Sequence, residues 1–162
     1  VGNQIYNSLA HLVKSQAPLN YQQLNRLLLS LKPTNELGRF DKRGREYEFG
    51  VKDCFEALRD YLQTQDIEIP PRAMFVEDYW DKNIDYFNDK TIAEWNHTPI
   101  SLNSIKENDV LIFKVFSNIN NHCGVYLGND IFYHHAENRL SCRENLYPQW
   151  KKWLVGAYRY GT

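Results

Sequence analysis

The chain has 162 residues, of which 43% are hydrophobic and 24% charged, and its formal net charge is -1. This composition predicts one folded domain with a real core, and it argues against disorder and against a basic surface that binds nucleic acid. No run of about 18 apolar residues is present, so we also expect no membrane span.

Two short amphipathic helices are expected at the start of the chain. Apolar residues recur at helical spacing from Ile5 to Val13 and from Leu24 to Leu31, and Pro33 ends the second run. The polar segment 34–45, with two glycines, is typical of a linker. Residues 1–44 are therefore expected to form a helical appendage and linker, and residues 45–162 the functional domain. Because the first residue is Val, we expect a processed product or a piece of a longer polypeptide.

A third helix is expected to begin at Cys54. Apolar residues keep helical spacing from there to about Thr64, and Pro70 and Pro71 then force extended chain. Asp53 immediately precedes this run and is a suitable N-cap. The aromatic and acidic segment 74–95 is expected to be helical only in part.

The second half of the chain is expected to form an antiparallel sheet. Runs of β-branched and aromatic residues occupy 110–116, 123–127, 131–134 and 154–160, with turn residues between them. Asp109 is expected to organise the turn before the first strand. With helices first and strands after, the predicted fold class is α+β, with the Cys54 helix packed on the sheet.

Three cysteines, Cys54, Cys123 and Cys142, lack CxxC spacing and leave at least one thiol unpaired. Cys54 is the candidate nucleophile, because the positive end of a helix dipole and unpaired backbone N–H groups favour a thiolate. Taken alone, it would more often be a small buried core residue. Cys123 is expected to be a buried strand residue that points away from the site, and Cys142 and His97 are expected to be structural.

Histidines supply the partners that a thiolate needs. A base must exchange protons with the thiol, and a third polar group must orient that base. His122 and His134 lie on successive predicted strands and can be neighbours on one face, so that His134 can hydrogen-bond the second nitrogen of His122. His135 is the alternative third member, but alternation places it on the opposite face, and the spacing from His122 favours His134.

A zinc site built from Cys54, Cys123, His122 and His134 is conceivable from the ligand types. The spacing matches no common structural-zinc pattern, however. We therefore expect no metal and no cofactor.

Four blocks of the sequence resemble the successive signatures of the NlpC superfamily of cell-wall cysteine peptidases. These blocks are Tyr47–Cys54, Asn108–Phe113, His122–Asn129 and Phe132–His134. The resemblance covers roughly Arg45 to Tyr160 and implies a reduced papain-like α+β fold. It implies cleavage of a γ-D-glutamyl to diamino-acid bond, or a neighbouring amide, in peptidoglycan stem peptides. Cys54 would be the nucleophile, His122 the general base and His134 the orienting residue.

The resemblance also implies residues around the substrate. Tyr47 matches the family's tyrosine, whose hydroxyl helps to line the oxyanion site together with the backbone N–H of Cys54. Asp53 precedes the nucleophile and supports it as the helix cap. The family's usual small Ser-Gly pair is replaced by Phe55 and Glu56, which are expected to narrow the pocket and to add a carboxylate beside it.

Within the superfamily, the chain looks most similar to tail-assembly peptidases of long-tailed phages. They share a bulky residue after the Asp-Cys pair, a His-His pair and a stretch similar to Arg139–Glu144. The expected setting is a virion-associated tail component or a secreted antibacterial toxin delivered to the cell envelope. The expected partners are a peptidoglycan peptide and either a tail or secretion-apparatus protein or an immunity protein. The alternatives are a papain-like protease or transferase acting on a protein, and a catalytically silent assembly module.

Overall fold

The computed structural model describes residues 43–72 and 75–161 of the chain. The two helices predicted before Pro33 lie outside the described residues. None of the helices within the described part has the length and hydropathy that a membrane crossing requires.

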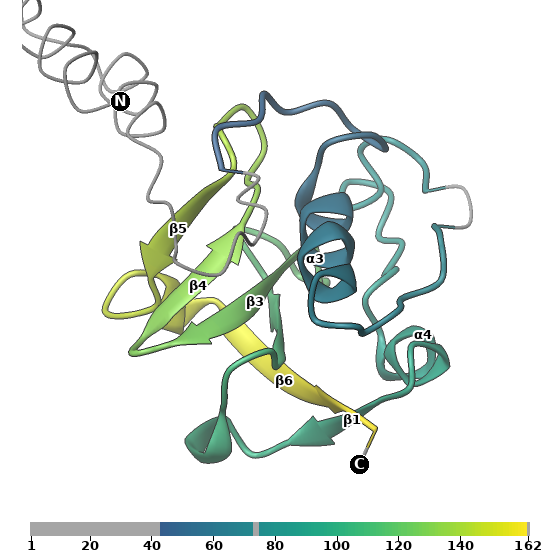
Figure 1. The fold of residues 1–162 in the computed structure, drawn as a ribbon. Coiled ribbons are helices and arrows are strands. Elements are labelled where there is room, and N and C mark those ends of the chain that lie inside the picture. Colours follow the sequence, from purple (N-terminus) through teal and green to yellow (C-terminus); the bar gives the residue numbers. More distant parts are fainter. Residues whose placement is uncertain (1–42, 73–74, 162) are drawn as a thin grey trace, which may run out of the picture. The chain divides into compact units, whose positions relative to one another are not determined.

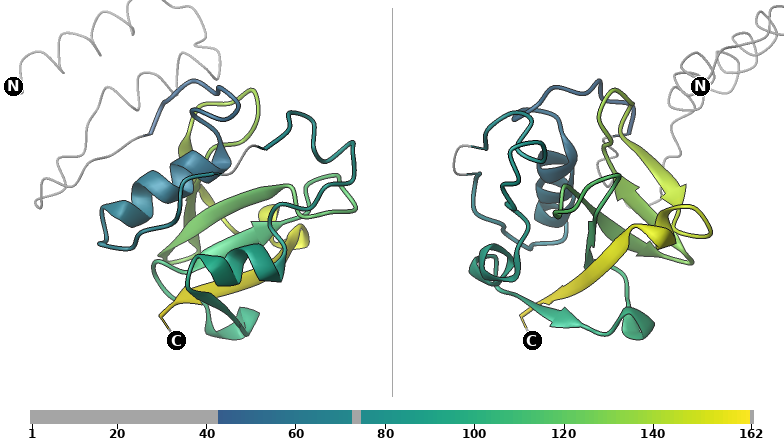
Figure 2. Two further views of the ribbon diagram at one scale, coloured as in Figure 1. Left: turned by 90° about the vertical axis from the view of Figure 1, so that its right-hand side faces the viewer. Right: turned by 180° about the vertical axis from the view of Figure 1, so that it is seen from behind.

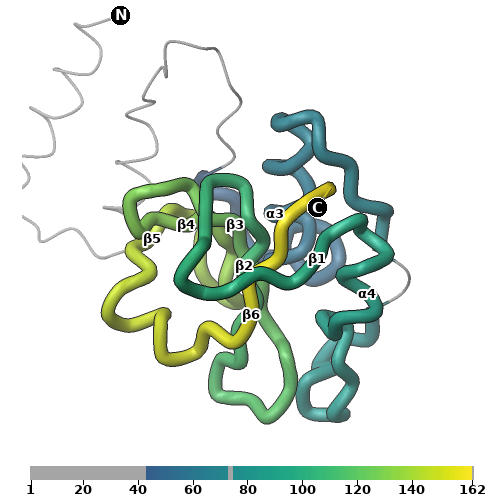
Figure 3. The backbone as a smooth tube through the Cα atoms, turned by 90° about the horizontal axis from the view of Figure 1, so that it is seen from below, coloured from purple at the N-terminus to yellow at the C-terminus, as the bar shows by residue number. Residues whose placement is uncertain are grey.

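A six-stranded sheet forms the centre of the described domain (Figures 1 and 3). All neighbouring strands are antiparallel, in the order β1-β6-β2-β3-β4-β5. The strands are β1 (His97–Ile100), β2 (Val110–Phe113), β3 (His122–Gly128), β4 (Ile131–His134), β5 (Cys142–Asn145) and β6 (Leu154–Tyr160). The predicted sheet is thus confirmed, and β1 and β5 are additional edge strands that the sequence analysis missed.

Two α-helices are described, α3 (Cys54–Gln63) and α4 (Asp89–Glu94). Helix α3 buries four apolar residues: Phe55, Ala57, Leu58 and Leu62. Figure 2 shows α3 and the irregular segment that follows it on the same side of the sheet, and α4 lies beside β1. Of the expected segment 74–95, residues 75–95 are described, and helix in them is limited to α4. Aromatic packing holds the part before α4, where the rings of Phe75 and Tyr86 stack with centroids 4.0 Å apart.

The sheet buries apolar side chains on both of its faces. Val110 and Ile112 belong to the core under α3, whereas Leu111 and Phe113 belong to a second core that contains Trp150. Successive side chains of β2 thus point alternately into the two cores, as expected for a strand whose two faces are both covered. His134 stacks on Phe132 of the second core, with ring centroids 4.4 Å apart, so it lies on the face opposite α3.

Gly124 allows β3 and β4 to approach closely where they carry the two histidines. It pairs with His134, and a Cβ added at this position would meet the Phe132 ring and the Tyr133 carbonyl oxygen at 2.9 Å. Real Cβ atoms do not approach other atoms so closely, so an added methyl group must displace β4.

We predict that Gly124→Ala lowers the free energy of unfolding by about 1–3 kcal/mol in urea titrations, because the methyl group overpacks the strand pair. Asn145→Ala, at an exposed position of the edge strand β5, is the control and should change the stability by less than about 0.5 kcal/mol. Wild-type stability in Gly124→Ala would contradict the close packing of β3 on β4.

Candidate active site

Asp53 organises the start of α3. Its Oδ1 accepts hydrogen bonds from the backbone N–H groups of Phe55 (3.1 Å) and Glu56 (3.2 Å), and its Oδ2 accepts one from Gly50 (2.7 Å). Arg72 Nη2 also donates to Oδ1, at 2.5 Å. The predicted N-cap is therefore confirmed. As the first helical residue, Cys54 has a backbone N–H without a partner inside the helix, and it lies at the positive end of the dipole.

The thiol of Cys54 has two neighbours on β3 that favour its ionisation. Hydrogen bonding with Cys123 lowers the pKa of Cys54 most, burial raises it, and His122 lowers it further, to about 5. Burial keeps the pKa of Cys123 well above its usual value, so this residue remains a thiol. Cys123 is buried, as predicted, but it does not point away from the site, because it lies on the face of β3 that α3 covers.

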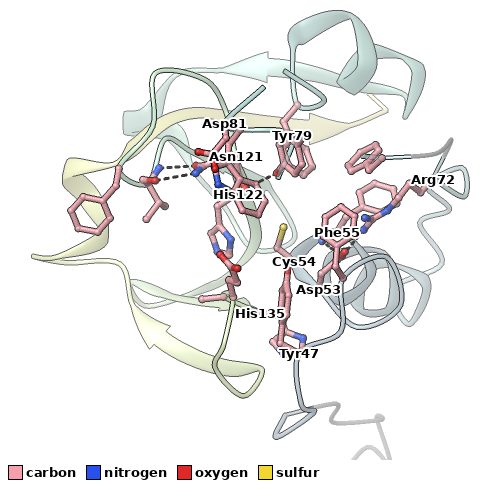
Figure 4. Close-up of a pocket in the computed structure, with 18 of the residues that line it drawn as sticks. Tyr47, Asp53, Cys54, Phe55, Arg72, Tyr79, Asp81, Asn121, His122 and His135 are labelled. Carbon is pink, nitrogen blue, oxygen red and sulfur yellow. Dashed lines mark hydrogen bonds and ion pairs between the residues drawn. The ribbon is translucent and has the colours of Figure 1, made fainter. Parts of the chain in front are cut away.

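His122 and His134 are joined directly, since His122 Nε2 lies 2.9 Å from His134 Nδ1. His134 pairs with Gly124 in the sheet, so His122 is its diagonal neighbour on the same face. Burial lowers the pKa of His122 below its usual value, and the hydrogen bond with Cys54 opposes this shift only in part. Because its Nε2 is engaged by His134, its Nδ1 is left for the thiol. Figure 4 shows the sulfur of Cys54 projecting from α3 on the side of His122.

His135 takes a different position from His134. It follows β4 directly, lines the cavity, and donates from Nε2 to the carbonyl oxygen of Arg139 at 3.0 Å. Its ring meets Tyr47 edge to face, with centroids 5.5 Å apart. Of the two adjacent histidines, His134 is therefore the one that contacts His122, as the spacing predicted.

Tyr47 and Phe55 line the cavity, whereas Glu56 does not. Burial raises the pKa of Tyr47, so its hydroxyl stays protonated and can act as a hydrogen-bond donor. The carboxylate expected beside the pocket is directed elsewhere: Glu56 lies 3.4 Å from Arg59 Nη1 and 3.9 Å from Arg72 Nε. This corrects the expectation for Glu56 as a pocket residue: its largely buried carboxylate is paired with two arginines, one of which, Arg72, lines the cavity in its place.

A cavity of about 350 Å³ opens over Cys54 (Figure 4). Its walls are largely aromatic and include Tyr47, Phe49, Phe55, Phe75, Tyr79, Trp80, Phe87, Phe116 and Trp150. Arg72 in the wall is paired with Asp53, so the remaining charged side chains of the lining are the exposed carboxylates Asp81 and Glu137. The lining of the cavity thus combines a largely aromatic surface with a net negative charge from Asp81 and Glu137.

Phe116 marks the rim of this cavity. It is 89% exposed and has a φ of 50°, a left-handed conformation that is strained for a phenylalanine. Its ring rests edge to face on Trp153, with centroids 5.0 Å apart. The loop between β2 and β3 therefore presents an aromatic ring to solvent beside the cavity.

One group among the described residues has the donor types of a metal site. His134, Cys142 and Glu144 place one ligand atom each within 4.8 Å of one another. Both oxygens of Glu144 already accept hydrogen bonds, Oε1 from Arg139 and Oε2 from Trp150. The zinc site that the ligand types allowed, built from Cys54, Cys123, His122 and His134, is disfavoured. His122 and His134 each use one ring nitrogen for the hydrogen bond between them.

Three residues at the site were missed from sequence. Glu144 and Arg139 lie behind His134, and Tyr79 donates its hydroxyl to the carbonyl oxygen of Asn121 at 2.7 Å, just before His122. In the sequence, the stretch Arg139–Glu144 is distinctive only for its resemblance to phage peptidases. Its acidic and basic residues gave no sign that they approach a histidine on another strand.

Comparison with known proteins places this site in a family. The sequence model of the NlpC/P60 family matches residues 44–159. Tail tip assembly protein K of Escherichia phage lambda is 28% identical over 117 residues, which cover 72% of this chain and 58% of that protein. The chain thus spans somewhat more than half the length of this relative.

A solved structure of low sequence identity shows the same fold. NlpC2 from Trichomonas vaginalis superposes with a TM-score of 0.50 at 17% identity, covering 91% of this chain and 49% of that one. An NLP/P60 family protein from Staphylococcus aureus, described as similar to a lipoprotein, has a TM-score of 0.49 at 21% identity, with coverages of 86% and 48%. The family match and the first of these likenesses confirm the predicted papain-like NlpC-type α+β fold.

We predict that iodoacetamide alkylates Cys54 selectively at about pH 7, with a rate that is half-maximal near pH 5, because the thiolate is lost below the pKa of about 5. Cys142, whose pKa burial raises to about 12, should remain unlabelled in peptide mass spectra.

Two variants separate the causes of this reactivity. Cys123→Ala and His122→Ala should each move the acidic limb of the alkylation profile to higher pH, since each removes a group that favours the thiolate. A wild-type profile in both variants would show that neither group activates Cys54.

Proposed function

The chain belongs to the NlpC/P60 family, and we propose that it hydrolyses an amide bond in the stem peptides of peptidoglycan, with Cys54 as the nucleophile. Family membership suggests cysteine peptidase or amidase activity on peptidoglycan-like substrates. The single observation that carries the proposal is the low pKa of Cys54 beside His122, at the floor of a cavity large enough for a peptide.

The first half of the reaction forms an acyl-enzyme. Cys54 gives its thiol proton to His122 Nδ1 and attacks the carbonyl carbon as the thiolate, and the resulting oxyanion lies near the Cys54 backbone N–H at the start of α3. The hydroxyl of Tyr47, which remains protonated, is the second donor in this proposal. The tetrahedral intermediate collapses as His122 Nδ1–H gives its proton to the leaving amine, and a thioester on Cys54 remains.

The second half releases the enzyme by hydrolysis. Neutral His122 takes a proton from a water molecule, which attacks the thioester carbonyl. Collapse of the second tetrahedral intermediate expels the Cys54 thiolate and leaves a carboxylic acid, while His122 is protonated again. His134 Nδ1 accepts from His122 Nε2 in both halves and keeps Nδ1 of His122 aimed at the reacting atoms.

The charge of the cavity supports a substrate that carries an ammonium group. Asp81 and Glu137 are both acidic and exposed in the lining, and the arginine of the wall is neutralised by Asp53. The free amine of a diamino acid in a stem peptide is a positively charged ammonium group, which these carboxylates would attract. We therefore propose the γ-D-glutamyl to diamino-acid bond, or a neighbouring amide, as the scissile bond.

The proposed setting is a phage tail, with the protein associated with the virion. The support is the likeness to tail tip assembly protein K, a protein named for a role at the tail tip. A tail or assembly protein is the partner that this setting implies. The alternative setting, a secreted toxin with an immunity protein, uses the same chemistry.

We predict that the protein releases new amino and carboxyl ends from purified sacculi, and that Cys54→Ala lowers the rate at least about 1,000-fold because the nucleophile is lost. Mass spectrometry of the soluble muropeptides measures both ends. Equal activity in Cys54→Ala would refute the proposed chemistry. Cleavage of unrelated proteins but not of sacculi would favour the protein-substrate alternative.

We also predict that the double variant Asp81→Asn, Glu137→Gln raises KM about threefold to tenfold for a stem peptide with a free side-chain amine, at unchanged kcat. The same peptide acetylated on that amine is the control and should not distinguish the variant from the wild type. If both peptides respond equally, the negative field does not select the ammonium group.

A further inference from the structure

A second layer of polar contacts lies behind His134, on the side away from Cys54. Glu144 Oε2 lies 3.5 Å from His134 Nε2, the nitrogen that His122 does not use. Glu144 itself is held by two donors, Arg139 on Oε1 and the indole N–H of Trp150 on Oε2. The carboxylate is therefore fixed in position against a fully buried histidine.

The position of Glu144 decides which nitrogen of His134 carries the proton. An ionised carboxylate only accepts hydrogen bonds, so at 3.5 Å it favours the tautomer of His134 that carries its proton on Nε2. Neutral His134 then has a bare lone pair on Nδ1, which is the acceptor that His122 Nε2–H needs at 2.9 Å. With the opposite tautomer, two N–H groups would face each other and the hydrogen bond between the histidines would be lost.

From this geometry we propose that Glu144 is a positioning residue, the fourth member of a buried chain Cys54–His122–His134–Glu144. The inference rests on the proposed function for the roles of Cys54 and His122. Glu144 touches no reacting atom. It sets the tautomer of His134 and, through it, the direction and the stability of the protonated His122 that pairs with the thiolate.

The other groups around Glu144 and His134 are compatible with this assignment. Arg139 neutralises the carboxylate from the loop after β4, His122 contacts His134 Nδ1, and burial together with the charges of Arg139 and His135 acts to lower the pKa of His134. Burial raises the pKa of Glu144, but its contacts with His134, Arg139 and Trp150 outweigh this and lower the pKa to about 2. Glu144 thus stays ionised throughout the working range of a thiolate.

Cys142 is the competing partner, since its Sγ lies 3.7 Å from His134 Nε2. A neutral thiol donates and accepts only weakly, whereas the ionised Glu144 carboxylate attracts the N–H dipole of His134 even at 3.5 Å. Burial keeps Cys142 protonated, so it has no charge with which to fix the imidazole. The carboxylate therefore dominates the choice of tautomer.

The test uses Glu144→Gln, which keeps the size of the side chain and removes its charge. The acidic limb of Cys54 alkylation by iodoacetamide is expected to move up by about 1 pH unit, because protonated His122 is less stable without the carboxylate behind His134. With muropeptide substrate, kcat should fall about tenfold to 100-fold and KM should stay within about twofold. Cys142→Ala should change neither quantity.

Asp109→Asn is the matched control for a purely structural effect. Asp109 is also a buried carboxylate paired with an arginine, Arg159 Nη2 at 2.7 Å, but its described hydrogen bonds are with Arg159 and the backbone N–H of Lys106, at the start of β2, and not with His122 or His134. This variant should lose stability in thermal unfolding with no shift of the alkylation limb. A limb that shifts equally in both variants would assign Glu144 a structural role and overturn the proposal.

An unchanged alkylation limb in folded Glu144→Gln would also overturn the proposal. Should this variant be too unstable to purify, Glu144→Asp, whose carboxylate is withdrawn by one methylene, is expected to shift the limb in the same direction by about half a unit, and no shift refutes the proposal. Alkylation needs no substrate. A chain that cleaves no muropeptide but shows these shifts would therefore contradict the proposed function and still support the positioning role.

Discussion

The carboxylate of Asp53 is the contact on which the rest of the site depends. It binds the first N–H groups of α3, the loop at Gly50 and the guanidinium of Arg72, and thereby fixes Cys54 as the first residue of the helix. Arg72 in turn lies over the ring of Phe75, 4.4 Å from its centroid, and ties the aromatic wall of the cavity to the same carboxylate. One buried ion pair thus sets both the position of the nucleophile and one wall of the space above it.

The nucleophile and its base reach the site from opposite sides of the sheet. Cys54 comes from the helix on one face, with Cys123 beneath it, whereas His134 lies in the core of the other face beside Trp150. His122, the first residue of β3, joins the two sides. This arrangement buries the histidines away from water while the thiol stays open to the cavity, and burial is why their pKa values fall.

The sequence allowed prediction of what depends on local pattern. The N-cap, the start of α3, the central strands and the order of the thiol and the two histidines all followed from periodicity and from the family signatures. The orientation of Glu56, the approach of Cys123 to Cys54 and the carboxylate behind His134 did not. Each depends on which face of a strand or helix meets another element far along the chain, and spacing in sequence does not encode that meeting.

In the proposed reaction, Cys54 forms the covalent bond to the substrate. Intact-mass spectrometry after rapid acid quench of the protein with a stem peptide tests this directly, because acid preserves a thioester. We expect a mass increase equal to the acyl part of the peptide, located on Cys54 after proteolysis and absent from Cys54→Ala. Turnover of the peptide with no adduct at any quench time, or an adduct on another residue, would contradict it.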